Sequence, residues 1–103
     1  MIIIENEYKR VQVKEGEWKR MKMNRIQLII LSILSKTQAN NPATSISINY
    51  IMNVTPLGKS YSTIYREVNL LNYNNYISEG VKDGKFNTYY INQNGIEKLK
   101  EML

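Results

Sequence analysis

The chain contains no cysteine and no histidine among its 103 residues. Without cysteine there are no disulfide bonds and no thiol chemistry, and without histidine there is no imidazole catalysis. The two absences together remove the side chains that hold nearly every zinc or transition-metal site. The carboxylates are scattered, and neither a calcium-binding loop pattern nor a phosphate-cradling glycine loop is present. We therefore expect a protein that is not an enzyme and that uses no metal or other cofactor.

Long apolar runs are missing as well. Residues 28–34 form an apolar stretch, which is much shorter than the ~20 residues a membrane-spanning helix needs. The first five residues lack the basic start and long apolar region of a secretory signal. These absences predict a cytoplasmic protein that does not enter a membrane. At 43% apolar residues the chain can bury only a modest core, so a homodimer is expected.

Acidic residues are absent from one long stretch of the chain. Between Trp18 and Arg66 there is no Asp or Glu. The basic residues of this stretch are Lys19, Arg20, Lys22, Arg25, Lys36, Lys59 and Arg66. This distribution predicts one basic face, which would suit a polyanionic partner. Chance clustering on a solvated surface is the alternative.

The first twenty residues differ from the rest in composition. Residues 2–4 and 8–13 have strand character, and Glu15-Gly16-Glu17 marks a break. A short hairpin, an extended arm and a helix over residues 5–13 all fit this segment. We divide the chain into an N-terminal extension, residues 1–20, and one domain, residues 21–103.

The start of the chain raises a separate hypothesis. Lys14-Glu15-Gly16 matches the in-frame translation of a purine-rich ribosome-binding sequence. The natural protein would then begin at Met21 or Met23. Intact-mass analysis of protein from the native host tests this, and a full-length mass would rule it out.

Two helices and a short strand are expected in the first half of the domain. Over residues 22–37 apolar side chains cover most of a helical circumference, and Asn24 can cap its start. A polar loop over residues 38–42 follows, and residues 44–46 could form one short strand. A second, short helix is expected over residues 47–53. Residues 55–58, Thr-Pro-Leu-Gly, then interrupt the helical pattern.

A third helix and a hairpin follow that break. Ile64, Val68 and Leu71 recur at spacings of four and three, which is a helical period, and Ser60 or Ser62 can cap the start. Strand composition returns over residues 76–81 and 86–91, on either side of an Asp83-Gly84 turn signal.

A last helix is expected over residues 93–103. Asn92 can cap it, and Ile96, Leu99 and Met102 would point inward. The predicted order is helix, short strand, helix, helix, strand, strand, helix. That order predicts an α+β fold, mainly α, of the winged helix-turn-helix kind.

Two short motifs in this region resemble a known group of proteins. The third helix carries Ser62-Thr63-Ile64-Tyr65, followed in register by Val68, Leu71 and Ile77. The second strand of the hairpin ends in the run 89–95, Tyr-Tyr-Ile-Asn-Gln-Asn-Gly. In this order and spacing the chain resembles the PadR-like winged-helix regulators, and more loosely the MarR-like ones. The resemblance implies a DNA-binding transcriptional regulator.

The chain departs from the PadR-like pattern at four places, one of which is a very short wing turn. Asn75 stands where the family has a Gly before the wing, and Asn accepts left-handed conformations better than most residues. Asn92 replaces a Thr and keeps an N-cap. The chain ends eight residues after Gly95, where many PadR-like proteins carry a longer dimerisation region. A dimer would therefore use the N-terminal segment or the last helix.

The candidate DNA contacts lie in the third helix and the turn before it, in the wing, and at the start of the first helix. They are Lys59, Ser60, Tyr61, Ser62, Thr63, Tyr65, Arg66, Asn69, Lys82, Lys85 and Arg25. Arg suits guanine edges and Asn suits adenine, whereas hydroxyls and amides at a helix start suit phosphates. The alternatives without DNA contact are an exposed Arg66–Glu67 pair, a Tyr65 packed on the domain, and wing lysines that only keep the hairpin soluble.

Most remaining aromatic and sulfur-containing side chains are expected in packing. The aromatic ones are Tyr73, Tyr76, Phe86, Tyr89 and Tyr90. The methionines are Met21, Met23, Met52 and Met102. Trp18, outside the predicted domain, is expected at an oligomer interface.

The sequence thus predicts a sequence-specific protein that binds double-stranded DNA, as a homodimeric transcriptional repressor on a pseudo-palindromic site. A centromere-binding segregation adaptor of a plasmid or virus is one alternative. A winged helix that serves only as a protein-interaction module is another.

Overall fold

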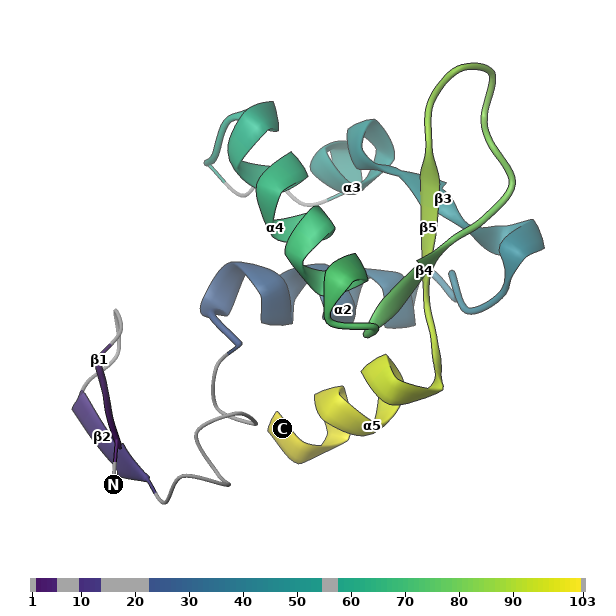
Figure 1. Cartoon of the computed structure of the whole chain (residues 1–103). Helices are drawn as coiled ribbons and strands as arrows, with labels where there is room; N and C mark the ends of the chain where they lie inside the picture. The colour runs from purple at the N-terminus through teal and green to yellow at the C-terminus, as the bar shows by residue number, and fades with distance from the viewer. Residues whose placement is uncertain (1, 6–9, 14–22, 55–57, 103) are drawn as a thin grey trace.

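The computed structural model describes residues 2–5, 10–13, 23–54 and 58–102 (Figure 1). In chain order the elements are β1 (Ile2–Glu5), β2 (Arg10–Val13), α2 (Arg25–Lys36), η2 (Pro42–Thr44), β3 (Ile46–Ser47), α3 (Ile48–Val54), α4 (Tyr61–Tyr73), β4 (Ile77–Glu79), β5 (Thr88–Ile91) and α5 (Gln93–Met102). From α2 onward this is the predicted order apart from the short 3₁₀ helix η2, and it confirms the winged helix-turn-helix fold class.

The N-terminal segment forms a hairpin. β1 and β2 pair antiparallel, with Ile2 opposite Val13 and Glu5 opposite Arg10. Of the three conformations that the sequence allowed here, the helix over residues 5–13 is therefore wrong. Trp18 and Met21 lie outside the described residues, so their predicted roles at an interface and in the core stay predictions.

Helix α2 is the centre of the hydrophobic core. Its Ile30, Leu31 and Leu34 are fully buried, and α4 and α5 both pack against it. The helix starts at Arg25 because the Asn24 side-chain oxygen accepts a hydrogen bond from the Gln27 amide at 2.9 Å. Both the central position and the cap confirm the sequence prediction.

Helices α3 and α4 form the helix-turn-helix unit. The predicted stripe of α4, Ile64, Val68 and Leu71, has no exposed surface. Gly58 precedes α4 with a φ of +67°, a backbone conformation that residues with a side chain rarely adopt. Ser60 is the N-cap, which resolves the choice between Ser60 and Ser62.

A three-stranded antiparallel sheet completes the fold, with β5 between β3 and β4. Ile46 lies opposite Tyr89, and Ile77 lies opposite Ile91. The strand expected at residues 44–46 occurs at Ile46–Ser47, because Pro42–Thr44 forms a 3₁₀ turn instead. The wing strands are shorter than predicted, and the loop between them projects beyond the sheet (Figure 1).

Two turn predictions and one helix-cap prediction are confirmed. Asn75, before the wing, has a φ of 65°, in the left-handed region. At the wing tip Gly84 has a φ of +63°, and Asp83 and Phe86 pair across the turn. Asn92 caps α5, since its side-chain oxygen accepts from the Gly95 amide at 3.0 Å.

Some predicted core positions differ in the structure. On α5 Leu99 is buried and Ile96 packs against the core, as predicted, whereas Met102 is only half-buried. The covered face also includes Lys98, whose Nζ lies 5.9 Å from the centre of the Tyr76 ring. A long aliphatic stem explains how a lysine can line a core with its charge near an aromatic face.

Two of the aromatic predictions are wrong. Tyr73 is 87% exposed and Phe86 is 44% exposed, whereas Tyr89 is buried and Tyr76 and Tyr90 are half-buried. Tyr73 comes two residues after Leu71, so on a helix it falls on the side away from the core. Phe86 precedes β5 and belongs to the wing loop. Of the methionines, Met23 is buried, Met52 packs against the core and Met102 is half-buried.

Candidate nucleic-acid interface

The first turn of α4 presents hydroxyl groups at the surface. Ser60 Oγ accepts from the Thr63 amide at 3.3 Å and lies 3.1 Å from both Ser62 Oγ and Thr63 Oγ1. Lys59 and Ser62 are exposed, and Thr63 is half-buried. A helix start with short hydroxyls and a lysine beside it suits a phosphate group.

The outer face of α4 continues this polar surface. Ser62, Tyr65, Arg66 and Asn69 follow one another at helical spacing on the side opposite the buried stripe. Tyr65 is 47% exposed, and its ring stacks on Tyr61 with centroids 6.2 Å apart. Asn69 is half-buried. Tyr65 is thus not packed into the domain, as the alternative without DNA contact had it.

Glu67 fastens α4 to the start of α2. Its side chain is 6% exposed, and its Oε1 accepts from Asn24 Nδ2 at 3.0 Å and from Gln27 Nε2 at 2.9 Å. From the sequence, Glu67 was expected only in a surface pair with Arg66. Its position directly before Val68 in the buried stripe was the available signal.

Arg66 pairs with Glu67 and remains largely exposed. Arg66 Nη2 lies 3.4 Å from Glu67 Oε2, while the Arg66 side chain is 67% exposed. The Arg66–Glu67 pair anticipated as an alternative is therefore present, but only Arg66 is exposed and Glu67 is buried. A guanidinium has five N–H donors, so one contact of this length leaves most of them for a ligand.

The base of the wing is held by a chain of hydrogen bonds. Thr88 Oγ1 donates to the Val81 carbonyl, and Ser45 Oγ lies 2.7 Å from Thr88 Oγ1 and 2.8 Å from the Pro42 carbonyl oxygen. The Gly80 amide donates to the Thr88 carbonyl at 2.9 Å. A Cβ at Gly80 would lie 2.1 Å from Ser45 Oγ, so a side chain there does not fit. The wing thus has a fixed base, and Lys82 and Lys85 are exposed near its tip.

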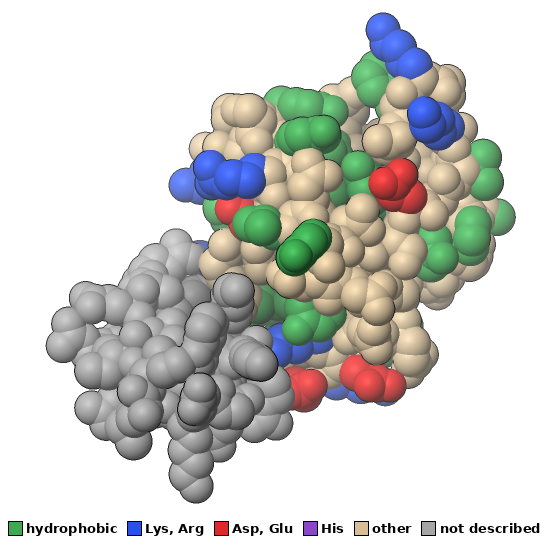
Figure 2. All heavy atoms as spheres, in the orientation of Figure 1, with side chains coloured by type: hydrophobic (Ala, Val, Ile, Leu, Met, Phe, Trp, Pro, Cys, Tyr) green, Lys and Arg blue, Asp and Glu red, His purple; other side chains and the backbone are tan. Residues whose placement is uncertain are grey.

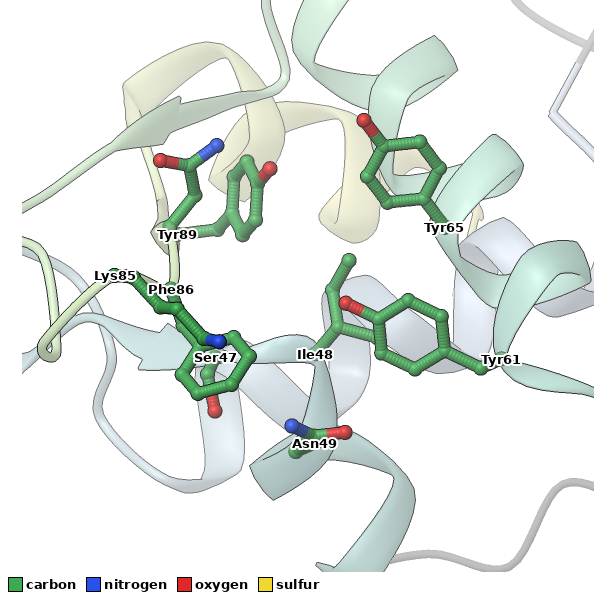
Figure 3. Close-up of a pocket in the computed structure, with 9 residues that line it drawn as sticks. Ser47, Ile48, Asn49, Tyr61, Tyr65, Lys85, Phe86 and Tyr89 are labelled. Carbon is green, nitrogen blue, oxygen red and sulfur yellow. The ribbon is translucent and has the colours of Figure 1, made fainter.

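A hollow of about 160 Å³ separates α4 from the wing. Figure 3 shows Tyr61 and Tyr65 reaching into it from α4, opposite Tyr89, Lys85 and Phe86. Ser47, Ile48, Asn49 and Asn87 complete its lining. The structure thus brings three of the predicted site residues, Tyr61, Tyr65 and Lys85, to one place.

The other lining residues were not predicted as site residues from the sequence. They come from the β3–α3 junction, from the end of the wing loop and from β5. The pairing of Ile46 with Tyr89 in the sheet brings the β3–α3 junction next to β5. A short sequence motif does not predict which distant strands pair, so it could not predict these lining residues.

The start of α4 and the wing loop lie at the same end of the molecule (Figure 1). In Figure 2 Lys and Arg side chains appear on the wing loop and beside α4, with mostly uncharged atoms between them. Arg25 is exposed at the start of α2, next to the Glu67 contacts, and does not line the hollow. The individual DNA contacts remain predictions.

The described residues contain no cluster of acidic side chains that could hold a metal ion. In the same part of the chain, no helix has the length and apolar character required to cross a membrane.

Comparisons with known proteins extend these observations. No family model matches the chain. The chain is 34% identical over 83 residues to the DNA-binding protein TubR of Clostridium botulinum C phage, which covers 81% of this chain and 100% of that protein. TubR from Bacillus megaterium pBM400 superposes with a TM-score of 0.72 at 21% identity, covering 84% of this chain and 92% of that one.

A second solved structure, the complex of Staphylococcus aureus MepR with DNA, gives a TM-score of 0.66 at 14% identity. The match covers 85% of this chain and 68% of MepR. At these identities the two structural likenesses show a shared fold and nothing more.

Proposed function

The chain belongs to the TubR family of DNA-binding proteins, and from that premise we propose that it binds double-stranded DNA through α4 and the wing. One observation carries the proposal: the start of α4, where its hydroxyls lie, is at the same end of the molecule as the lysine-bearing wing loop. Arg66 follows in the second turn of α4 with a side chain that is 67% exposed. The protein acts by binding and not as an enzyme.

In this proposal α4 enters the major groove. Arg66 donates to a guanine edge, and Asn69 meets an adenine. Lys59 and the hydroxyls of Ser60, Ser62 and Thr63 hold phosphates beside the helix start. Lys82 and Lys85 reach the neighbouring minor groove or its backbone, and Arg25 contacts the backbone from α2.

The bound form is a homodimer on a pseudo-palindromic site. Two α4 helices then enter successive major grooves about one helical turn, ~34 Å, apart. The modest size of the core supports this arrangement, since one small domain makes few contacts with DNA alone.

Two roles fit such a protein. The PadR-like motifs in α4 and at the exit of the wing support a transcriptional repressor. The similarity to a DNA-binding protein from a phage supports a segregation adaptor that coats repeated centromere-like sites. A repressor binds one or a few operators near its target gene, whereas an adaptor spreads cooperatively on clustered repeats. The same family membership makes a winged helix without DNA contact the weaker reading.

A fluorescence-anisotropy titration tests the proposal. The full chain is titrated against a duplex from upstream of its own gene and a scrambled duplex, each at two salt concentrations. We expect preferential binding to the upstream duplex that weakens steeply with salt, because phosphate contacts release counterions. Equal binding to both duplexes would contradict sequence specificity at this site, and no binding at either salt would contradict DNA binding.

Arg66→Ala tests how α4 reads DNA. The variant should weaken binding to the upstream duplex by about 1–3 kcal/mol if Arg66 contacts a base edge. Lys100→Ala, an exposed lysine in the last turn of α5, is the matched control and should bind like the wild type. An equal loss on the scrambled duplex would assign Arg66 to the backbone and contradict base reading.

A further inference from the structure

Three tyrosine side chains from two elements, α4 and β5, face the hollow between α4 and the wing. Tyr61 and Tyr65 reach it from the first two turns of α4, and Tyr89 forms its inner wall from β5 (Figure 3). Tyr89 is 2% exposed, whereas Tyr61 and Tyr65 remain 43% and 47% exposed. The hollow therefore has one fixed aromatic wall and one that stands open to an approaching ligand.

The lining combines aromatic surface with hydrogen-bond donors and one cation. Lys85 Nζ lies 5.7 Å from the centre of the Phe86 ring, at the wing side of the hollow. None of the described lining residues carries a carboxylate. The three phenols are neutral at pH 7, as tyrosines ordinarily are, so they can donate hydrogen bonds. Such a lining suits an anionic group attached to a small apolar body.

The shape of duplex DNA indicates which group this is. A major groove and the minor groove beside it are separated by a single sugar-phosphate strand. With α4 in one groove and the wing in the other, that strand passes between α4 and the wing, where the hollow lies. A deoxyribose with its phosphate has both the anionic and the apolar part that the lining suits.

We propose that this hollow seats one deoxyribose-phosphate unit of the strand between the two grooves. The Tyr61 and Tyr65 hydroxyls donate to the free phosphate oxygens, Lys85 supplies the opposing charge, and Phe86 packs against the sugar. This inference rests on the proposed DNA binding and adds to it a defined binding site for one backbone unit, here called the seat. The seat includes Phe86, which was predicted from the sequence to lie in the core.

The two kinds of donor leave different signatures. A phenol is neutral, so its removal weakens binding without changing the number of counterions released. Removal of Lys85 changes that number, and the slope of log affinity against log salt should become shallower by about one. Both losses should be equal on the upstream and scrambled duplexes, because a phosphate carries no sequence information.

The variants Tyr61→Phe, Tyr65→Phe and Lys85→Ala test the seat in the full chain. Each tyrosine variant keeps its ring and should bind about 3- to 10-fold more weakly, the loss of one hydrogen bond, with an unchanged salt slope. Tyr73→Phe is the control, because Tyr73 also lies on α4, is 87% exposed and does not line the hollow. Wild-type affinity of both tyrosine variants would overturn the proposal, and so would a loss confined to the upstream duplex.

Duplexes with one neutral methylphosphonate at successive positions locate the seated phosphate. At that position the wild type should bind more weakly, and Tyr65→Phe should add no further loss, since its phosphate partner has already been neutralised. Independent losses at every position would overturn the seat while leaving DNA binding intact. If the wild type binds no duplex at all, the proposed function itself fails, and this separates the two failures.

Discussion

The inner and outer faces of α4 are built from different kinds of side chains, although they alternate along the same 13 residues. On the inner face Ile64, Val68 and Leu71 are fully buried, and the carboxylate of Glu67 accepts from both Asn24 and Gln27. On the outer face Tyr65 and Arg66 are largely exposed. The inner face stabilises the fold, so the side chains of the outer face can suit a ligand without a large cost in stability.

The largest expected contrast between the faces comes from two adjacent leucines. Leu71 is fully buried and Leu70 is 42% exposed. Leu71→Ala should lower the free energy of unfolding by about 2–5 kcal/mol through lost burial and a cavity. Leu70→Ala should change it by no more than about 0.5 kcal/mol. Urea denaturation of the two variants checks this, and similar losses from both would contradict the division of the helix into two faces.

Glu67 gives the next largest effect. Glu67→Ala leaves the buried side-chain amide of Gln27 without its acceptor and should cost about 1–3 kcal/mol of unfolding free energy. Glu67→Gln is the matched control, since it keeps an oxygen that can accept the same bonds, and it should cost less. Chemical denaturation measures both. An alanine variant as stable as the wild type would show that the network does not hold α4 to α2.

The wing separates in the same way into a fixed base and an exposed tip. Thr88→Val keeps the shape of the side chain but removes the hydroxyl that donates to the Val81 carbonyl, at a cost of about 1 kcal/mol. Hydrogen exchange at the Gly80 amide, which donates to Thr88, should become faster. Lys82→Ala at the exposed tip is the control and should leave this exchange unchanged. Slow exchange in the Thr88 variant would contradict the account of the base.

The smallest effect concerns alkaline pH. Burial raises the pKa of Tyr89 above its unfolded value of about 10, because desolvation disfavours the phenolate. Its contribution to stability is therefore present below pH ~10 and is lost as pH rises through the folded pKa. The unfolding free energy should fall more steeply above pH ~10 in the wild type than in Tyr89→Phe. Identical pH profiles would contradict this role for Tyr89.

Local signals in the sequence predicted the parts of the fold that depend on neighbouring residues. The caps Asn24, Ser60 and Asn92 and the turns at Asn75 and Gly84 all follow from the chemistry of one or two residues. The buried stripe of α4 follows from its period. These features need no knowledge of the rest of the chain.

Features that depend on distant residues were not predictable in the same way. The Glu67 network joins positions 43 and 40 residues apart. The lining of the hollow depends on the pairing of β3 with β5, and the burial of Lys98 depends on Tyr76 from before the wing. Tyr73 is different, since its spacing from Leu71 already placed it on the outer face of α4.

The most direct test of the central claim is an amide-resolved NMR titration of the full chain with its upstream duplex. If the outer face of α4 and the wing bind DNA, the largest shifts should fall on residues 59–69 and 81–87, and α5 should change little. Largest shifts on α5, or none on α4 and the wing while the duplex binds, would contradict the claim.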